Sequence, residues 1–297
     1  RRTIPFMSAK HLVGIIPVAG QSLDFNFPWH DCLQPIGTDY LAVERSVVEC
    51  ANAGCKTIWI VCHDDMQPLI RHRLGDYVQD PVYLYRNFDP GNVLYQRKPI
   101  PIQYVPIHPK DRDRRDCLAW SALYGAQAAY WTSIQISRWL TPDKYYVSFP
   151  YGAYDPELLR EHRIDIKSDK TFFLSYEGKT IKDGEYLGFT FNEEQFIKYR
   201  KDLREKGTSS HILDGEELKR LPPEEKWSAR YFSLDEVFGS AIIDEQNVVE
   251  LPWYHNIGSW KGLRSFLGSD IILERPSRDM LSAKGLDKLG EFNDEEQ

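Results

Sequence analysis

A glycine turn follows a strongly apolar segment near the start of the chain, and its backbone could bind an anionic group. Residues 12–19 are rich in valine and isoleucine and lead into Gly20. A strand that runs into a glycine turn presents backbone N–H groups at its carboxyl end, where open α/β sheets bind ligands. A connection between a strand and a helix also needs glycine wherever φ is positive, so the turn alone does not establish a site.

Three carboxylates stand near the ends of predicted strands. Asp24 and Asp31 follow the first strand, and Asp155 follows a later one. Carboxylate oxygens are ligands that divalent cations such as Mg²⁺ prefer in proteins. One hypothesis is therefore that the three aspartates bind a divalent metal together, although their spacing does not select this hypothesis.

Two other sets of side chains near these strand ends have more than one interpretation. His30 stands beside Asp31, and His63 stands beside Asp64. Either histidine could act as a base or a metal ligand, but polar clusters at strand ends are also common without such a role. Five aromatic side chains could stack on a base or a sugar ring, or could pack in the core or at its rim. These aromatic residues are Phe25, Phe27, Trp29, Tyr151 and Tyr154.

Alternating strands and helices position these residues over the first 160 positions. Residues 12–19 and 56–62 are almost continuously apolar, which predicts two buried parallel strands. Between them, residues 39–53 have the apolar spacing of a crossover helix that ends at Gly54. Further helices are predicted at 66–74 and 116–139, and further strands at 102–107 and 144–149. This alternation predicts an α/β fold with a doubly wound, mostly parallel open sheet of the Rossmann-related type.

The pattern becomes mixed after about residue 160. Strands are predicted at 171–176 and 185–191, and a charged amphipathic helix at 193–205. The polar segment 207–225 predicts a mobile excursion, and the charged end of the chain predicts frayed structure. We therefore expect an α/β half at 1–165, a mixed half of the same domain at 166–275, and a charged tail at 276–297.

Composition and charge restrict the class of protein. The 297 residues are 42% hydrophobic and 13% aromatic, which provides the core of one or two domains. A net charge of −7 argues against general nucleic-acid binding. No apolar run approaches the roughly 20 residues that cross a bilayer, and the first residues lack a secretory signal, so we expect a soluble cytoplasmic protein with no membrane partner. The five cysteines include no Cys-x-x-Cys pair, which predicts buried free thiols.

Several short motifs occur in a fixed order along the chain. The first strand and turn, Ile15-Ile-Pro-Val-Ala-Gly20, precede Leu33-Gln-Pro-Ile-Gly37. Tyr145-Tyr-Val-Ser-Phe149 and Tyr186-Leu-Gly-Phe189 follow, and Trp253-Tyr-His-Asn-Ile-Gly-Ser259 comes late. This order resembles that of the sugar-nucleotide pyrophosphorylases, over roughly residues 11 to 270. The resemblance implies a nucleotidyltransferase-type fold similar to that of nucleotide-diphospho-sugar transferases.

The resemblance also implies an activity and a set of site residues. The activity is the joining of a sugar 1-phosphate to a nucleoside triphosphate, with Mg²⁺ as cofactor and a nucleotide or nucleotide-sugar as partner. Residues 1–165 would be the nucleotide-binding half, and residues 166–275 the sugar-binding half. The implied nucleotide-binding residues are Ala19, Gly20, Gln21, Ser22, Asp24 and Asp116. The implied sugar-binding residues are Tyr151, Gly152 and Gly188, and the implied metal ligands are Asp155 and Asn256.

The chain departs from this family's pattern at the charged positions. Asp24 falls where the family has a loop arginine, Asp31 falls near its lysine, and Asn256 replaces a metal-binding aspartate. Carboxylates facing a triphosphate would repel it, because the chemistry needs cations at fixed places. Substitute cations are therefore predicted elsewhere, although the arginines also fit a solvated charged loop. The candidates are Arg112, Arg114 and Arg115 before the long helix, and Lys179 and Lys182 near the family's sugar-phosphate lysine.

Three hypotheses about function remain open. The first is a divergent nucleotidyltransferase, and the second is a non-catalytic binding or assembly module that retains the fold. The third is a glycosyltransferase that uses a nucleotide-sugar donor and needs a metal or basic residues for the leaving diphosphate. A homo-oligomer or larger assembly is compatible with all three. The fold alone does not choose among them.

Overall fold

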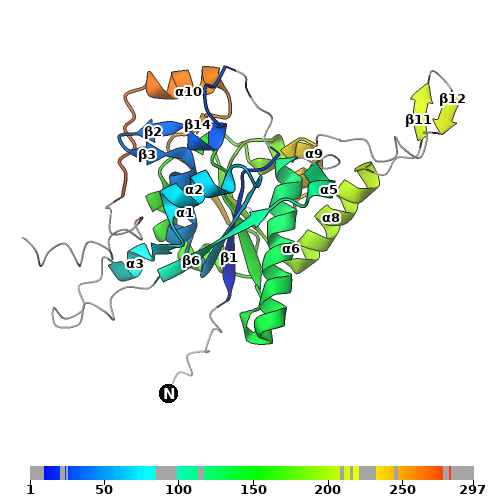
Figure 1. The fold of residues 1–297 in the computed structure, drawn as a ribbon, viewed down its shortest axis with the longest axis horizontal. Coiled ribbons are helices and arrows are strands. Elements are labelled where there is room, and N and C mark those ends of the chain that lie inside the picture. The colour runs from blue at the N-terminus through cyan, green and yellow to red at the C-terminus, as the bar shows by residue number, and fades with distance from the viewer. Residues whose placement is uncertain are drawn as a thin grey trace, which may run out of the picture.

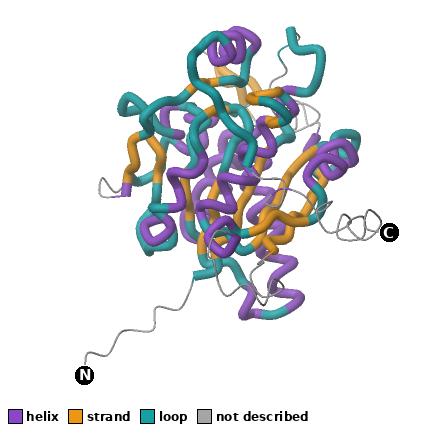
Figure 2. The backbone as a smooth tube through the Cα atoms, turned by 90° about the vertical axis from the view of Figure 1, so that its left-hand side faces the viewer, coloured by secondary structure: helices purple, strands orange, loops and turns teal. Residues whose placement is uncertain are grey.

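The body of the protein is an eight-stranded sheet. Helices cover this sheet, as Figures 1 and 2 show from two perpendicular directions. The strands have the order β13-β9-β10-β7-β1-β4-β6-β5. The structure is a computed structural model. It describes residues 10–20, 24, 26–84, 99–112, 117–207, 211–214, 217–220, 232–243, 247–276 and 281.

Four parallel strands form the centre of this sheet. They are β1 (Leu12–Pro17), β4 (Thr57–Cys62), β6 (Pro99–Pro106) and β7 (Lys144–Val147). β1 pairs with β4 on one side and with β7 on the other, so the direction of the winding changes at β1. All six residues of β1 are buried, as expected for a parallel strand covered on both faces. In such sheets, ligands bind beyond the carboxyl ends of the strands at the point where the winding reverses.

Helices α1 (Ala42–Ala53) and α6 (Leu118–Ile136) cover opposite faces of β1 (Figure 1). A Cβ atom on Gly14 would meet the Cys50 side chain of α1 at 2.8 Å, so this face of β1 lies against α1. The next residue, Ile15, lies against Gly125 of α6, where an added Cβ would be 2.9 Å from the Ile15 side chain. Since successive strand residues point to opposite faces, the two helices sandwich the strand. The predicted doubly wound architecture is confirmed.

The second half of the chain extends the sheet with strands of both directions. β10 (Phe189–Phe191) is antiparallel to β7, β9 (Phe173–Ser175) is antiparallel to β10, and β13 (Val248–Glu250) is parallel to β9. At the other edge, β5 (Tyr77–Gln79) is antiparallel to β6 and was not predicted. The sheet is therefore mixed but mostly parallel.

One expectation for this half needs correction, and a second segment contains strands that were not predicted. The strand predicted at 185–191 begins only at Phe189, because the Leu187 N–H donates to the Glu185 carbonyl at 2.8 Å and closes a tight turn. The segment expected to be a mobile excursion contains an antiparallel hairpin, in which β11 (His211–Asp214) pairs with β12 (Glu217–Arg220). The remaining elements connect or cover the sheet. They are η1 (Asp31–Leu33), β2 (Pro35–Gly37), β3 (Tyr40–Leu41), α2 (Gln67–Leu74), α3 (Pro81–Leu84), α5 (Pro109–Arg112), η2 (Arg138–Leu140), β8 (Gly152–Ala153), η3 (Pro156–Arg160), α7 (Arg163–Ile166), η4 (Ile181–Asp183), α8 (Glu193–Gly207), α9 (Leu234–Phe238), β14 (His255–Asn256) and α10 (Trp260–Leu267).

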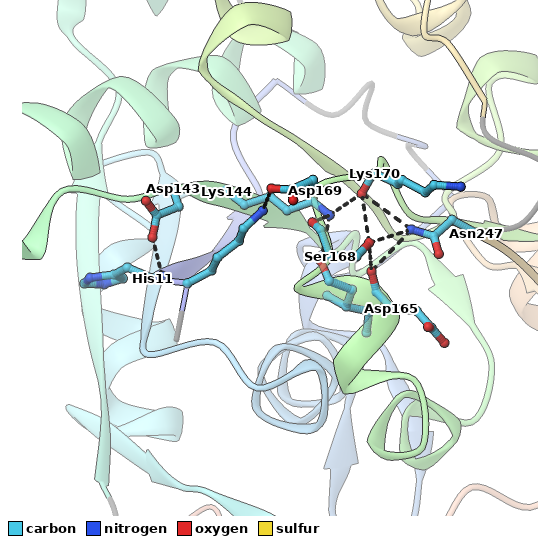
Figure 3. A network of polar contacts seen from close by, with 10 residues as sticks. His11, Asp143, Lys144, Asp165, Ser168, Asp169, Lys170 and Asn247 are labelled. Carbon is cyan, nitrogen blue, oxygen red and sulfur yellow. Dashed lines mark hydrogen bonds and ion pairs between the residues drawn. The ribbon is translucent and has the colours of Figure 1, made fainter. Parts of the chain in front are cut away.

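A buried lysine organises the amino end of the sheet, opposite the predicted site (Figure 3). The Lys144 ammonium donates to the carbonyls of Ile166 at 2.7 Å, Ser168 at 3.0 Å and Lys170 at 2.5 Å. The Asn247 amide donates to the Ser168 hydroxyl at 3.0 Å in the same network. These bonds satisfy the carbonyls of the loop after α7.

Two further expectations concern the cysteines and the membrane. All five cysteines are buried free thiols, as predicted. No helix in the described part of the chain is long and apolar enough to span a membrane.

Candidate functional site

The first strand ends in a backbone arrangement that requires glycine. The N–H groups of Val18 and Ala19 both donate to the Val61 carbonyl, at 2.8 and 2.9 Å, and close the end of β1 against β4. Gly20 follows with φ 87°, and an added Cβ would lie 2.4 Å from the backbone nitrogen of Cys117. Because Cys117 is the N-cap of α6, Gly20 allows the helix to approach the end of β1. This contact accounts for the glycine without a ligand.

Asp24, where the family resemblance expects an arginine, attaches the loop after Gly20 to α10. Its carboxylate accepts a hydrogen bond from the Trp260 N–H at 2.9 Å. It also accepts from the backbone N–H of Asn26 at 3.0 Å, and these bonds lower the pKa of Asp24, with Trp260 contributing most. The ring of Phe27 meets the Trp260 ring edge-on, with 5.7 Å between centroids. The predicted aromatic platform is therefore at least partly occupied by contacts within the protein.

Asp31 is buried next to this loop, beside the half-buried His30. His30 Nδ1 lies 3.2 Å from Asp31 Oδ1 and accepts a hydrogen bond from the Cys32 N–H at 3.3 Å. Neither oxygen of the Asp31 carboxylate has a hydrogen-bond partner among the described residues. Burial raises the pKa of Asp31 to about 6, and burial followed by the charge of His63 lowers the pKa of His30. At neutral pH this pair carries no cation that could replace the family's lysine.

The carboxyl end of β7 joins the late part of the chain. Gly152 of β8 pairs with Asn256 of β14 in an antiparallel ladder, and the Ile257 N–H donates to the Tyr151 carbonyl at 2.8 Å. The buried Tyr151 hydroxyl donates to the Val18 carbonyl at 3.1 Å, which links this region to the end of β1. Three of the predicted site residues, Tyr151, Gly152 and Asn256, therefore lie together.

Glu185 lies between two predicted site residues, although the sequence did not single it out. Its Oε2 accepts from the Tyr254 hydroxyl at 3.1 Å and from the Asn256 amide at 3.5 Å. Its Oε1 lies 3.9 Å from the Lys179 ammonium. The carboxylate therefore brings two predicted site residues, Asn256 and Lys179, to one point. No single-sequence signal marks it, because residues 185–191 were expected to form a regular strand.

A buried polar cluster lies beneath the end of β7. The fully buried Arg45 donates to Glu49 at 2.8 Å and to the Phe149 carbonyl at 2.6 Å. The hydroxyls of Tyr146 and Tyr154 donate to the other Glu49 oxygen at 2.6 and 2.7 Å. This cluster fixes the segment that leads from β7 into Tyr151 and Gly152.

Internal contacts explain both of the predicted sugar-site glycines. A Cβ added to Gly188 would lie 2.2 Å from the Tyr146 hydroxyl and 2.6 Å from Glu49. A Cβ added to Gly152 would lie 2.3 Å from the Tyr186 carbonyl. Both glycines are required by internal packing, so their presence is not itself a sign of a sugar ligand.

The described residues do not fit the Mg²⁺ site that the resemblance implies. Asn256 Oδ1 accepts from the Gly258 N–H at 3.1 Å, and Asp155 Oδ1 accepts from the Glu157 N–H at 2.9 Å at the start of η3. No described contact joins Asp155 to Asn256. Among the described residues, no group of three or more histidines, cysteines or carboxylates could hold a metal ion. The three-aspartate hypothesis finds no support in this arrangement.

The remaining predicted residues lie apart or outside the described structure. Lys182 belongs to η4, whose backbone packs near Gly239 at the end of α9, and no described contact joins it to Glu185. Arg112 is the last residue of α5. Outside the described residues are Gln21, Ser22, Phe25, Arg114, Arg115 and Asp116.

Comparison with known proteins concerns the fold alone. No protein-family model and no curated protein sequence matches the chain. A putative glucose-1-phosphate thymidylyltransferase from Bacillus anthracis, solved in complex with a sucrose, is similar in structure, with a TM-score of 0.50, 10% identity, and coverage of 89% of this chain and 98% of that one. The chain has a sugar-nucleotidyltransferase-like fold. The resemblance predicted from the order of motifs is therefore confirmed at the level of the fold.

Two further solved structures align with this fold at slightly lower scores. A 4-diphosphocytidyl-2C-methyl-D-erythritol synthase from Anaerococcus prevotii has a TM-score of 0.48 and 14% identity, over 87% of this chain and 95% of that one. A UDP-glucose pyrophosphorylase complexed with UDP-glucose has a TM-score of 0.47 and 11% identity, over 86% of this chain and 97% of that one.

Proposed function

We propose that this chain is a divergent nucleotidyltransferase-like protein that binds a nucleotide or nucleotide-sugar beyond the carboxyl ends of β1 and β7. The observation that carries the proposal is the meeting of two segments that the sequence assigned to different halves of the site. The loop after Gly20 contacts α10 through Asp24 and Trp260, and α10 directly follows the strand that pairs Asn256 with Gly152. The nucleotide would lie beside Gly20, and the sugar beside Glu185.

The activity that this arrangement would serve is nucleotidyl transfer to a sugar 1-phosphate. A phosphate oxygen of the sugar attacks the α-phosphorus of the triphosphate, the bond to the β-phosphate breaks, and pyrophosphate leaves. This step needs positive charge around the phosphates. Lys179 would lie on the sugar side, but the nearby Glu185 carboxylate offsets its positive charge. The prediction that Arg112, Arg114 and Arg115 supply the remaining charge stays open.

A non-catalytic binding module is the second candidate. Asp24 and Asp31 stand at positions where the family resemblance expects cations, and Asp24 is engaged in holding α10. Gly20, Gly152 and Gly188 are each accounted for by internal contacts. A chain that kept the fold for binding or assembly would have this combination of intact packing and altered charge.

Thermal unfolding in the presence of ligands tests both candidates. The full chain would be heated with each nucleoside triphosphate plus MgCl₂, with glucose 1-phosphate, and with UDP-glucose, each at millimolar concentration. A ligand that binds the folded state alone raises the melting temperature. A shift with a triphosphate, followed by pyrophosphate release when a sugar 1-phosphate is added, supports the transferase.

The other outcomes separate the alternatives. A rise in melting temperature with a triphosphate but without pyrophosphate release supports the binding module. A rise with UDP-glucose alone supports use of a nucleotide-sugar as donor. If no nucleotide, nucleotide-sugar or sugar phosphate changes the melting temperature, the proposed function is wrong.

A further inference from the structure

Glu185 is held in a fixed position by a buried tyrosine. The Tyr254 hydroxyl donates to Glu185 Oε2 at 3.1 Å and accepts from the Tyr186 N–H at 3.1 Å. Tyr254 is 9% exposed, and the pKa of its hydroxyl is raised well above its usual value, first by burial and then by the charge of Glu185. A phenol that stays protonated keeps donating, so the carboxylate stays at this place.

The carboxylate also lies within ion-pair distance of a lysine. The Lys179 ammonium lies 3.9 Å from Glu185 Oε1, and its side chain is 61% exposed against 23% for Glu185. The pair is loose, but together it presents no net charge to a ligand. A further anion placed beside Lys179 would also be close to Glu185, whose repulsion exceeds the attraction because the less exposed carboxylate is screened less by solvent.

The same atoms suit an uncharged hydroxyl-bearing group. A carboxylate accepts hydrogen bonds only, whereas the Asn256 amide has both donors and an acceptor and the Lys179 ammonium donates. Asn256 is exposed and its amide lies 3.5 Å from Glu185 Oε2, so the amide and the Lys179 ammonium approach the two oxygens of this carboxylate from two other segments of the chain. Sugar hydroxyls both donate and accept, and can satisfy such a mixed set.

We propose that Glu185 determines the charge preference of the sugar side of the site, which takes a neutral or amino sugar and rejects an acidic one. This inference rests on the proposed function. Glu185 is a specificity residue in this scheme, because it contacts the sugar and discriminates between sugars that differ in charge. Lys179 supplies a donor to the sugar, and its attraction for an anion is outweighed by the repulsion from the less exposed Glu185.

Two matched pairs of probes test the proposal by calorimetric titration of the full chain. The first pair is UDP-glucose and UDP-glucuronic acid, and the second is glucose 1-phosphate and glucuronic acid 1-phosphate. Within each pair, the sugars differ only by a hydroxymethyl group and a carboxylate. The wild-type chain is expected to bind the glucose form more tightly, by up to about fivefold, since an unopposed unit-charge repulsion at about 4 Å in water corresponds to that ratio and the attraction of Lys179 reduces it.

The variants assign this preference to Glu185. Glu185→Gln keeps the shape and an acceptor for Tyr254, and it is expected to lose most of the preference for glucose. The loss is expected because Glu185→Gln leaves the Lys179 ammonium free to attract the glucuronic acid probes, which then bind more tightly. Adding Lys179→Met to Glu185→Gln is expected to remove this gain in affinity. Asp76→Asn is the charge control, since Asp76 forms an exposed ion pair with Arg71 beside β5 at the far edge of the sheet.

The outcomes distinguish this inference from the function on which it rests. If both probes bind and Glu185→Gln leaves their ratio unchanged, or Asp76→Asn changes it equally, the role of Glu185 is disproved while the proposed function stands. If no probe binds to any variant, the proposed function itself fails, and the role of Glu185 fails with it. Melting curves of each variant verify that it is folded.

Discussion

The carboxylate of Asp24 accepts a hydrogen bond at 2.9 Å from the backbone N–H of Trp260, which is 236 positions later in the chain. The segment that continues from α10 makes further contacts with the same part of the protein. Arg275 donates to Asp39 at 2.8 Å and to Glu44 at 3.0 Å. The late segment 259–276 thus contacts Asp24 on one side and Asp39 and the start of α1 on the other. The positions of Asp24 and of the start of α1 therefore depend on this late segment.

The Asp24→Asn variant tests this attachment through its dependence on pH. The pKa of Asp24 is lowered from 3.8, chiefly by the Trp260 N–H. The stability that its charge contributes is therefore fully present above about pH 4 and is lost as the pH falls through the lowered folded-state pKa. We expect the variant to melt slightly below the wild type at pH 7 and the difference to narrow in acid. Hydrogen exchange of the Trp260 amide should accelerate at pH 7, and unchanged exchange there would contradict the attachment.

Gly20 and Gly178 form a matched pair for testing the contact between β1 and α6. Both glycines have positive φ, 87° and 74°, but a Cβ on Gly178 would meet nothing within 4 Å. Gly178→Ala is expected to cost about 1 to 2 kcal/mol for the left-handed backbone alone. Gly20→Ala adds a clash with the Cys117 backbone and should cost about 1 to 3 kcal/mol more. Urea unfolding measures the free energy of unfolding of both variants. Equal losses of stability would show that α6 is not in tight contact with Gly20.

The main architecture could be predicted because its signals are local. β1 and β4 are buried on both faces and so are continuously apolar, and Gly54 ends α1 with the left-handed geometry that glycine favours. The strand predicted at 185–191 was too long because the turn at Glu185 leaves no local signature. β5 is only three residues long and depends on its pairing with β6.

The candidate site was harder to predict because its contacts are distant in sequence. Gly152 is required because the Tyr186 carbonyl lies close to it, and Gly188 because Tyr146 and Glu49 do. No regular spacing in the sequence connects these glycines with their neighbours. Glu185 is linked to Asn256 only once β8 and β14 have paired. The family resemblance implied roles for Asn256 and Lys179, but it gave no indication that a carboxylate lies between them.

Arg45 and Glu49 provide a test of the buried cluster beneath the site. Both side chains are fully buried, and their charged atoms are 2.8 Å apart. Arg45→Met leaves the Glu49 charge buried without its cation, so the free energy of unfolding should fall by about 3 to 5 kcal/mol. Arg71→Met is the control, because Arg71 and Asp76 are also 2.8 Å apart but more than half exposed. Removing this exposed pair should cost far less stability, because solvent and salt screen it, and equal losses in urea unfolding would refute a structural role for the buried pair.

Asp31 is expected to show the opposite pH dependence from Asp24. Burial raises the pKa of Asp31 from 3.8 to about 6. A carboxyl group with a raised folded-state pKa favours folding below its unfolded value and loses that contribution as the pH rises through 6. The wild type is therefore penalised at pH 7 to 8 by about 3 kcal/mol relative to a neutral side chain, since one pKa unit corresponds to about 1.4 kcal/mol. Asp31→Asn should raise the stability by up to this amount at pH 8.

The pH profile separates this electrostatic effect from a change in packing. The advantage of Asp31→Asn should shrink between pH 7 and pH 4 and vanish below the unfolded pKa, because the wild-type carboxyl group is then protonated in both states. His30 does not compensate, since burial lowers its pKa and keeps the imidazole neutral near pH 7. Urea unfolding at pH 8, 6 and 4 measures the difference. An advantage that is constant over this range, or that grows in acid, would mean that Asp31 is not buried as an unpaired carboxylate beside the candidate nucleotide loop.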